Sequence, residues 1–138
     1  MRTKFGVLVV GITLVCLGRP LVAHHSFSSE YDEKKSVSIK GTVSKVEWTN
    51  PHVRIYVDEK DASGKITTWN MELATPSALT RNGWTSKSLK VGDEVTIKGF
   101  AAKNDQPRAS AGAVTLADGR SLFAGAAPGT DPAAAPLQ

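Results

Sequence analysis

The chain has 138 residues, with 17 Lys and Arg against 13 Asp and Glu, and a formal net charge of +4. This length excludes a large multi-domain enzyme, because one domain needs on the order of 100–150 residues. Hydrophobic residues make up 41% and charged residues 22%, which is typical of a globular chain and excludes a disordered or collagen-like one. The basic balance would favour a nucleic-acid partner, so its distribution along the chain matters.

The first 23 residues have the layout of a secretory signal peptide. Arg2 and Lys4 form a short positive region, residues 5–17 are uncharged and mostly apolar, and the segment ends in the small residue Ala23. A membrane-spanning helix needs about 20 apolar residues, so the 5–17 run is too short and favours a cleaved signal over an anchor. We expect cleavage after Ala23 and a mature protein without a membrane anchor.

Removal of this segment changes the charge of the protein. Three of the 17 basic residues lie in the signal, which holds no acid, so 14 bases remain against 13 acids for a net charge of +1. The single cysteine, Cys16, also leaves, so we expect neither a disulfide nor a thiolate ligand in the mature chain. Because phosphate binding depends on Lys and Arg, the mature sequence predicts no nucleic-acid partner.

Alternating apolar residues predict a strand over residues 36–48. The apolar parity set by Ile39 and Val43 flips at Val46. A β-bulge near Ser44–Lys45 would produce this flip and would curl the strand.

One short helix and several further strands follow in the prediction. Thr75 can cap a helix, Pro76 suits its first turn and Gly83 can end it, so residues 75–83 predict about two helical turns. Asp118-Gly119 is typical of a tight hairpin turn. Strands are predicted at residues 53–58, 66–73, 94–100, 110–116 and 120–123.

These elements predict an all-β fold with one short helix, a small five- to six-stranded OB-like β-barrel preceded by the signal peptide. An immunoglobulin-like sandwich is the alternative, but it would have about seven strands and no helix in the middle. We expect the barrel over residues 24–123. Residues 124–138 are rich in Ala, Pro and Gly with one charge, and predict a disordered tail because they can bury little apolar surface.

Several short motifs occur in order between residues 24 and 123. They are HHSF (24–27), EYD (30–32), KGTV (40–43), EWTNPH (47–52), GW (83–84) and LKVGDEV (89–95). Together they resemble an exported bacterial family, domain of unknown function 6152. The resemblance implies a Gram-negative exported protein, periplasmic or secreted, with a small β-rich domain. It implies no catalytic residue. Val91 departs from the pattern, which has Pro in this loop.

The three histidines are the candidate metal ligands. Cleavage after Ala23 would make His24 the amino terminus, where its amine and its imidazole can chelate one metal ion. His25 adds a second imidazole, and His52 is the only other histidine. Such nitrogen-rich ligands suit Cu(II), with Zn and Ni less favoured. In the alternative interpretation His24-His25 is a solvated chain end and His52 only forms a hydrogen bond in the turn after Pro51.

Trp48, Asn50 and Tyr56 are candidate residues for ligand binding or protein interaction near the first interstrand loop. Tyr56 has the opposite parity to the apolar residues of its strand, so we expect its ring to face outward. The alternative interpretation makes Trp48 a core residue and Asn50 a turn former.

Two function hypotheses follow, and neither is enzymatic. The sequence has no G-x-S-x-G elbow, no H-E-x-x-H and no phosphate loop. The first hypothesis is an exported periplasmic β-barrel that binds a transition metal, with copper as the favoured cofactor. The second is a periplasmic module that binds a protein or a small non-metal ligand and has no catalytic activity.

Overall fold

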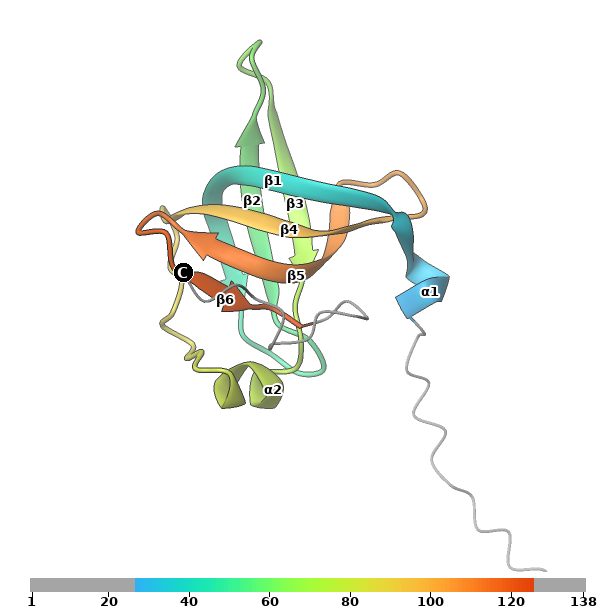
Figure 1. Ribbon diagram of the computed structural model, residues 1–138. Helices are drawn as coiled ribbons and strands as arrows, with labels where there is room; N and C mark the ends of the chain where they lie inside the picture. Colours follow the sequence, from blue (N-terminus) through green and yellow to red (C-terminus); the bar gives the residue numbers. More distant parts are fainter. Residues whose placement is uncertain (1–26, 126–138) are drawn as a thin grey trace, which may run out of the picture.

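The computed structural model describes residues 27–125 (Figure 1). The predicted signal, His24, His25 and residues 126–138 lie outside the described residues. The elements are α1 (Phe27–Glu30), β1 (Tyr31–Glu47), β2 (Arg54–Lys60), β3 (Ile66–Glu72), α2 (Pro76–Arg81), β4 (Glu94–Ala102), β5 (Arg108–Leu116) and β6 (Ser121–Phe123). Within the described range, no helix has the length and apolar character needed to cross a bilayer.

The six strands form one sheet that curls into a nearly closed barrel. The strand order is β3-β2-β1-β4-β5-β6, and β3 also pairs with β5. The β3–β5 pair is parallel and short, running from Asn70 opposite Arg108 to Glu72 opposite Ser110, whereas the other pairs are antiparallel. With α2 between β3 and β4, this is an OB-like architecture, and the predicted fold class is confirmed.

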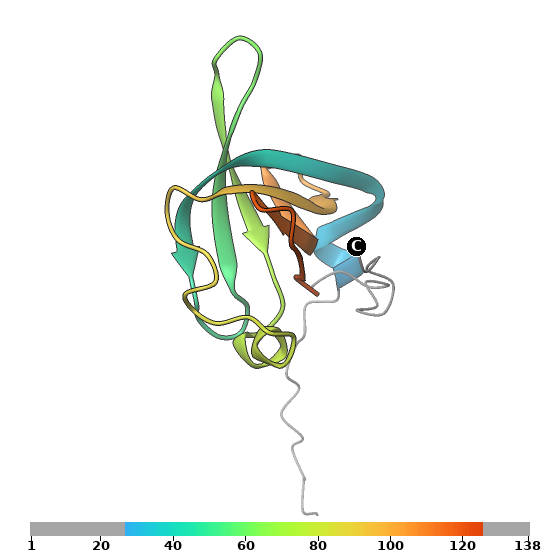
Figure 2. The same ribbon diagram turned by 60° about the vertical axis from the view of Figure 1, so that its left-hand side comes forward.

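β1 is long enough to pair with two other strands, and Figure 2 shows it curving across the barrel from α1. Residues 36–42 pair with β4, and residues 42–47 pair with β2. Gly41 lies where these two pairings meet, and a Cβ atom there would stand 2.3 Å from the carbonyl oxygen of Asp58. The register shifts between Val43 and Lys45, so the bulge predicted from the parity flip is confirmed.

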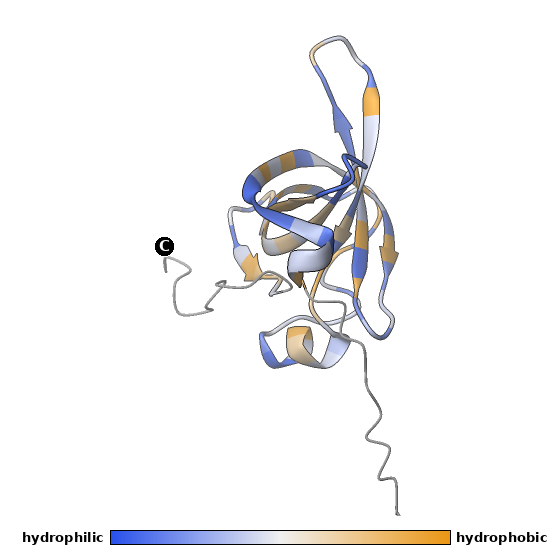
Figure 3. Ribbon diagram, turned by 90° about the vertical axis from the view of Figure 1, so that its right-hand side faces the viewer, coloured by the Kyte–Doolittle hydropathy of each residue, from blue (hydrophilic) through white to orange (hydrophobic). Residues whose placement is uncertain are grey.

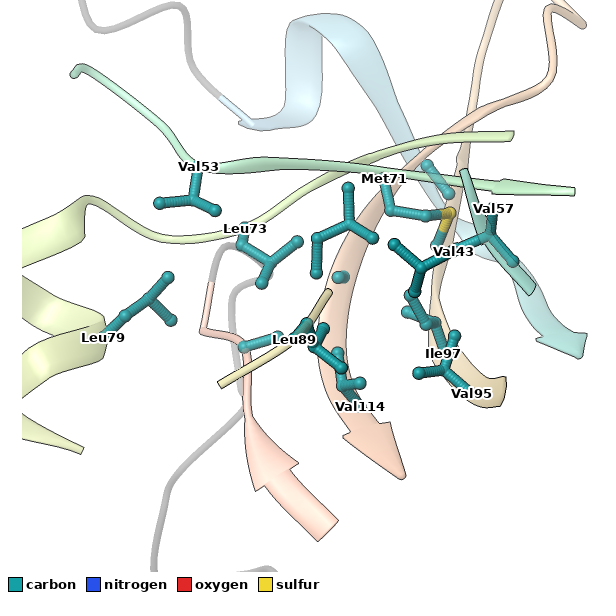
Figure 4. Packing of buried hydrophobic residues seen from close by; sticks show 14 of the residues in the cluster. Val43, Val53, Val57, Met71, Leu73, Leu79, Leu89, Val95, Ile97 and Val114 are labelled. Atoms are coloured by element: carbon teal, nitrogen blue, oxygen red, sulfur yellow. The ribbon is translucent and has the colours of Figure 1, made fainter. Parts of the chain in front are cut away.

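The buried residues form one core inside the barrel. Hydrophilic and hydrophobic residues alternate along β1 (Figure 3), as expected for a strand with one solvated face. Figure 4 shows the packed side chains, with Leu79 of α2 beside Leu73 and Val53 at one end of the barrel. The fully buried large side chains are Trp84, Ile55, Met71, Leu73, Leu79, Ile97, Val43, Val53, Val57 and Val114.

The predicted helix after β3 is confirmed as α2. The Thr75 hydroxyl accepts a hydrogen bond from the amide of Ala78 (3.2 Å), Pro76 occupies the first turn, and Asn82 is the C-cap. Gly83 follows with a φ of 85°, a left-handed conformation that glycine adopts without strain.

The two ends of the barrel domain differ from the sequence prediction. β1 begins at Tyr31 instead of residue 36, because Tyr31 pairs with Ala102, and the four-residue α1 precedes it. At the other end Ala124 is buried; its amide donates to Gly112 (2.9 Å), and its carbonyl accepts from Ala74 (2.8 Å). The folded body therefore continues past Phe123, where the tail was expected to begin.

Candidate metal and ligand sites

His52 lies half-buried in the loop between β1 and β2. Its Nδ1 atom is 3.0 Å from the carbonyl oxygen of Leu73, the residue that follows β3. Because a carbonyl can only accept, Nδ1 must carry the proton, which leaves the lone pair of the neutral ring on Nε2. Val53 and Leu73 hold this loop beside β3, since the Leu73 amide donates to the Val53 carbonyl (2.8 Å). The ring is therefore oriented by the backbone, as metal-ligating histidines commonly are.

The other metal ligands predicted from sequence are not part of the described structure. His24 and His25 lie outside the described residues. Between residues 27 and 125, no group of three or more His, Cys, Asp or Glu side chains is arranged to hold a metal ion. A metal site that uses His52 would therefore need ligands from beyond this range.

Trp48 and Asn50 lie on either side of Thr49 in the same loop but have different surroundings. Trp48 is half-buried and packs against the core. It also lines a small hollow with Trp84 and Leu89 that is too narrow to admit a water molecule. Asn50 is exposed, and its peptide bond to Pro51 is cis. The packing of Trp48 supports the interpretation of this residue as part of the core.

Tyr56 lies on the outer face of β2, as its parity predicted. Its hydroxyl donates to the Glu47 carboxylate (3.2 Å), and the Lys45 ammonium lies 5.2 Å from its ring centre. Lys45 and Glu47 form an ion pair at 2.5 Å. The hydrogen bond from Lys45 lowers the pKa of Glu47 below its ordinary value. Tyr56 is therefore an aromatic ring among charges that neutralise each other.

This polar surface continues across β3 to β5. Arg54 pairs with Glu72 (2.7 Å) and donates to Asn70 (3.3 Å). Arg108 pairs with Glu30 of α1 (2.5 Å). We call the outer-face residues that join these contacts the polar band; they are Glu30, Lys45, Glu47, Arg54, Tyr56, Asn70, Glu72 and Arg108. Each of its three cations has a carboxylate partner, so the polar band carries little net charge.

A buried tyrosine adjoins one end of the polar band. Tyr31 is 3% exposed, and its ring lies 5.3 Å from the guanidinium carbon of Arg108. Burial, with the charge of Glu72 as the next cause, raises the pKa of Tyr31 above its ordinary value. Of these residues, Tyr56 was predicted as a candidate for ligand binding or interaction, whereas Tyr31 and the rest of the polar band were not. The alternation along the strands predicted an outward direction for some residues of the polar band. The ion pairs between them depend on the strand register, which sequence patterns do not define.

Comparison with known proteins identifies a family for this chain, and solved structures of other proteins are similar to its fold. A crystal structure of the mitochondrial single-stranded DNA-binding protein Rim1 from S. cerevisiae is similar with a TM-score of 0.48 and 12% identity, covering 60% of this chain and 93% of that chain. No curated protein matches the sequence. The profile of a family of unknown function, DUF6152, matches residues 11–111. The family resemblance of the sequence motifs is thus confirmed, and the chain belongs to the DUF6152 family.

Proposed function

We propose that this protein is an exported periplasmic binding protein that takes copper through His24, His25 and His52. The observation that carries the proposal is the hydrogen bond from His52 Nδ1 to the Leu73 carbonyl at 3.0 Å. This contact engages Nδ1, the ring nitrogen that carries the proton. It leaves Nε2 as a ligand of fixed orientation. The proposed role is binding and carriage, without catalysis.

The chemistry of the proposed ligands favours copper. Cleavage after Ala23 would give His24 a free amine beside its imidazole, and His25 and His52 would bring two further imidazoles. Four neutral nitrogen donors match the tetragonal geometry that Cu(II) prefers. Hard cations such as Mg²⁺ and Ca²⁺ prefer oxygen ligands and would bind weakly here.

We expect His52→Asn to weaken copper binding by about tenfold or more, in line with the loss of a well-oriented metal contact. Asparagine keeps an N–H near the position of Nδ1 for the Leu73 carbonyl, but it removes the Nε2 lone pair. Copper would be titrated by calorimetry into protein that begins at His24, and thermal melting would confirm that the variant folds.

A second version with one extra residue before His24 tests the amine. It should also bind more weakly, because its amino group is displaced from the imidazole of His24. Affinities equal to that of the protein beginning at His24, in both altered proteins, would contradict the proposal.

We do not expect this protein to bind nucleic acid. The cations of the polar band are already paired with Glu47, Glu72 and Glu30, and binding to phosphates requires free Lys or Arg. Fluorescence anisotropy with a labelled single-stranded oligonucleotide near physiological salt should show no saturable binding. Saturable binding that weakens steeply with added salt would contradict this expectation.

A second candidate function is a non-metal ligand- or protein-interaction module. The outward ring of Tyr56, between Glu47 and Asn70 on the β1–β2–β3 surface, favours it, because OB-folds take ligands on the face of strands 2 and 3. A strain with all three histidines replaced would then grow as the wild type does, whereas Tyr56→Ala would reproduce the effect of deleting the gene. The copper proposal expects the reverse.

A further inference from the structure

Three side chains on the outer face of the barrel each keep a polar atom buried without a hydrogen bond. Within residues 27–125, these atoms are the Tyr31 hydroxyl, the Arg108 Nε atom and the Ser110 hydroxyl. Tyr31 is 3% exposed and Ser110 is fully buried. Because an unpaired polar atom is costly to bury, a group of three such atoms calls for a partner that the described chain does not supply.

The three side chains are neighbours. Arg108 and Ser110 lie two residues apart on β5, and the core residue Ala109 between them shows that both point outward from the barrel. The guanidinium carbon of Arg108 lies 5.3 Å from the centre of the Tyr31 ring. The buried polar atoms of the three residues therefore belong to one place on the outer face.

Aromatic rings and α1 cover this place at the start of β1 (Figure 1). Phe27 of α1 lies with its ring centre 5.4 Å from that of Tyr31 and 6.0 Å from that of Phe100 on β4. Phe100 is in turn the partner of Ser110 in the pairing of β4 with β5. These rings explain how a serine on the outer face can be fully buried, and they exclude water from its hydroxyl.

The three polar atoms can all donate to one acceptor. The Nε–H group of Arg108 can only donate, and the hydroxyls of Tyr31 and Ser110 can each donate one hydrogen bond. Burial raises the pKa of Tyr31 above its ordinary value, so its hydroxyl keeps its proton. A carboxylate accepts several hydrogen bonds and carries the charge opposite to that of a guanidinium, so it matches this set of donors.

Glu30 shows how a carboxylate meets Arg108. Its Oε2 atom lies 2.5 Å from the Nη2 atom of Arg108, whereas a carboxylate that uses a guanidinium fully takes two parallel N–H groups. The side chains of Glu30 and Arg108 are 31% and 29% exposed, so solvent reaches the ion pair although Nε is buried. Ion pairs with this exposure contribute little to stability, and another carboxylate can therefore displace Glu30.

The surroundings permit this exchange. Lys103 holds the backbone of α1, through its amide to the Glu30 carbonyl (3.0 Å) and through its ammonium to the Ser28 carbonyl (2.6 Å), so the helix can stay in place while the Glu30 side chain moves. Glu72 lies opposite Ser110 in the pairing of β3 with β5. Because Glu72 is paired with Arg54 (2.7 Å), its charge opposes a second carboxylate only weakly.

We propose that Arg108, Tyr31 and Ser110 form a binding site for the carboxylate of a small organic acid, and that Glu30 fills part of this site until the ligand displaces it. The ligand would accept from Nε and Nη2 of Arg108 and from the two hydroxyls. The Glu30 side chain ends in a group with the size of acetate, so the space that it leaves suits a small acid. The site shares no residue with the proposed copper site and does not depend on it.

Acetate titration of a Glu30→Ala variant tests the site. We expect the metal-free variant to bind acetate saturably and about fivefold more tightly than the unaltered protein, a ratio that corresponds to the strength of a half-exposed ion pair. The amide NMR signals of Tyr31, Arg108 and Ser110 would follow binding, with ionic strength held constant by sodium chloride. Glu33→Ala removes a carboxylate at an exposed position of β1 and is the matched control, which should leave acetate affinity unchanged.

Two further variants, made in the Glu30→Ala background, test the donors. Ser110→Ala removes a hydroxyl that has no hydrogen-bond partner in the described residues, so it should not lower the melting temperature. It should nevertheless weaken acetate binding by about tenfold, the usual loss with one hydrogen bond to a charged group. Arg108→Lys keeps the positive charge but offers no planar pair of N–H groups, and it should abolish saturable binding.

Acetamide has the shape of acetate without its charge and is the control ligand. Acetate should raise the melting temperature of Glu30→Ala, because a ligand that binds only the folded state stabilises it, whereas acetamide should not. Equal acetate affinities of Glu30→Ala and the unaltered protein would overturn the inference. So would saturable binding of acetamide, or an unchanged acetate affinity in a folded Ser110→Ala variant. Since all of these measurements are made without metal, none of them bears on the copper proposal.

Discussion

Trp84→Ala is expected to lower the free energy of unfolding by about 3–5 kcal/mol, the usual range for removal of a buried tryptophan. Trp84 is 2% exposed and is the largest side chain that is fully buried in the described structure. Its indole nitrogen donates to the Phe123 carbonyl at 2.7 Å. The substitution would therefore open a cavity and also remove a contact of β6, which is the edge strand of the sheet in the described residues. A domain of this size is stable by only about 5–15 kcal/mol.

Trp84→Phe separates packing from hydrogen bonding. It keeps a ring in the core but leaves the Phe123 carbonyl without its donor, which should cost about 1–3 kcal/mol. Urea unfolding followed by circular dichroism measures both variants. Val91→Ala is the control, because Val91 is 66% exposed and its loss should change stability by less than about 0.5 kcal/mol. A Trp84→Ala protein within that same margin of the wild type would contradict the role of Trp84.

Gly41→Ala is expected to destabilise the domain by about 2–3 kcal/mol, at the upper end of the usual range for overpacking. The added methyl group would stand 2.3 Å from the carbonyl oxygen and 2.8 Å from the carbonyl carbon of Asp58, and 2.9 Å from a methyl group of Val57. Two of these three atoms belong to the backbone of β2, so side-chain rotation cannot relieve the contact. β1 and β2 would have to separate at the point where β1 passes from one partner to the other.

The control for Gly41→Ala is Ser38→Ala, an exposed position on the same strand that should be nearly neutral. Gly99→Ala is a second case of the same kind, because its Cβ would stand 2.0 Å from the carbonyl oxygen of Ser110. Thermal and urea unfolding should rank both glycine variants well below Ser38→Ala. Equal midpoints for Gly41→Ala and Ser38→Ala would show that the strands can separate at this point without loss of stability.

Much of the barrel could be predicted because its strands each have one buried face. Ile55 and Val57 are fully buried while Tyr56 between them faces out, as the period of two predicted. The flip of parity at Val46 located the bulge before Lys45. Local signals also sufficed for α2, where a capping hydroxyl and a proline act within one turn.

The ends of the domain could not be predicted because they depend on distant partners. Residues 31–36 (YDEKKS) show no apolar alternation, yet they lie in β1 because the chain follows β4. The helix α1 has no capping pattern of its own and is held by Phe100 and Arg108. Ala124 carries no strand signal, and its burial results from backbone bonds to Gly112 and Ala74.

The candidate site could likewise be predicted only in part. The composition marked His52 as a candidate, but its tautomer follows from a carbonyl 21 residues further along the chain. Likewise, Arg54 meets Glu72 only because β2 and β3 pair in one register. Pairings of this kind become visible only when the strands are in place.

The parallel pairing of β3 with β5 determines when the barrel can close during synthesis. β3 is made early, but its partner is residues 108–110, and β4 and α2 come between them. β1 likewise cannot pair with its second neighbour, β4, until residues 94–102 have been made. Such distant pairings form late, because the ends of a long loop must first meet. Nearly the whole domain must leave the ribosome before its apolar residues can be buried. The nascent chain therefore remains unfolded for most of its synthesis. A chain with this order of events suits passage across a membrane before folding, as the export that we propose would require.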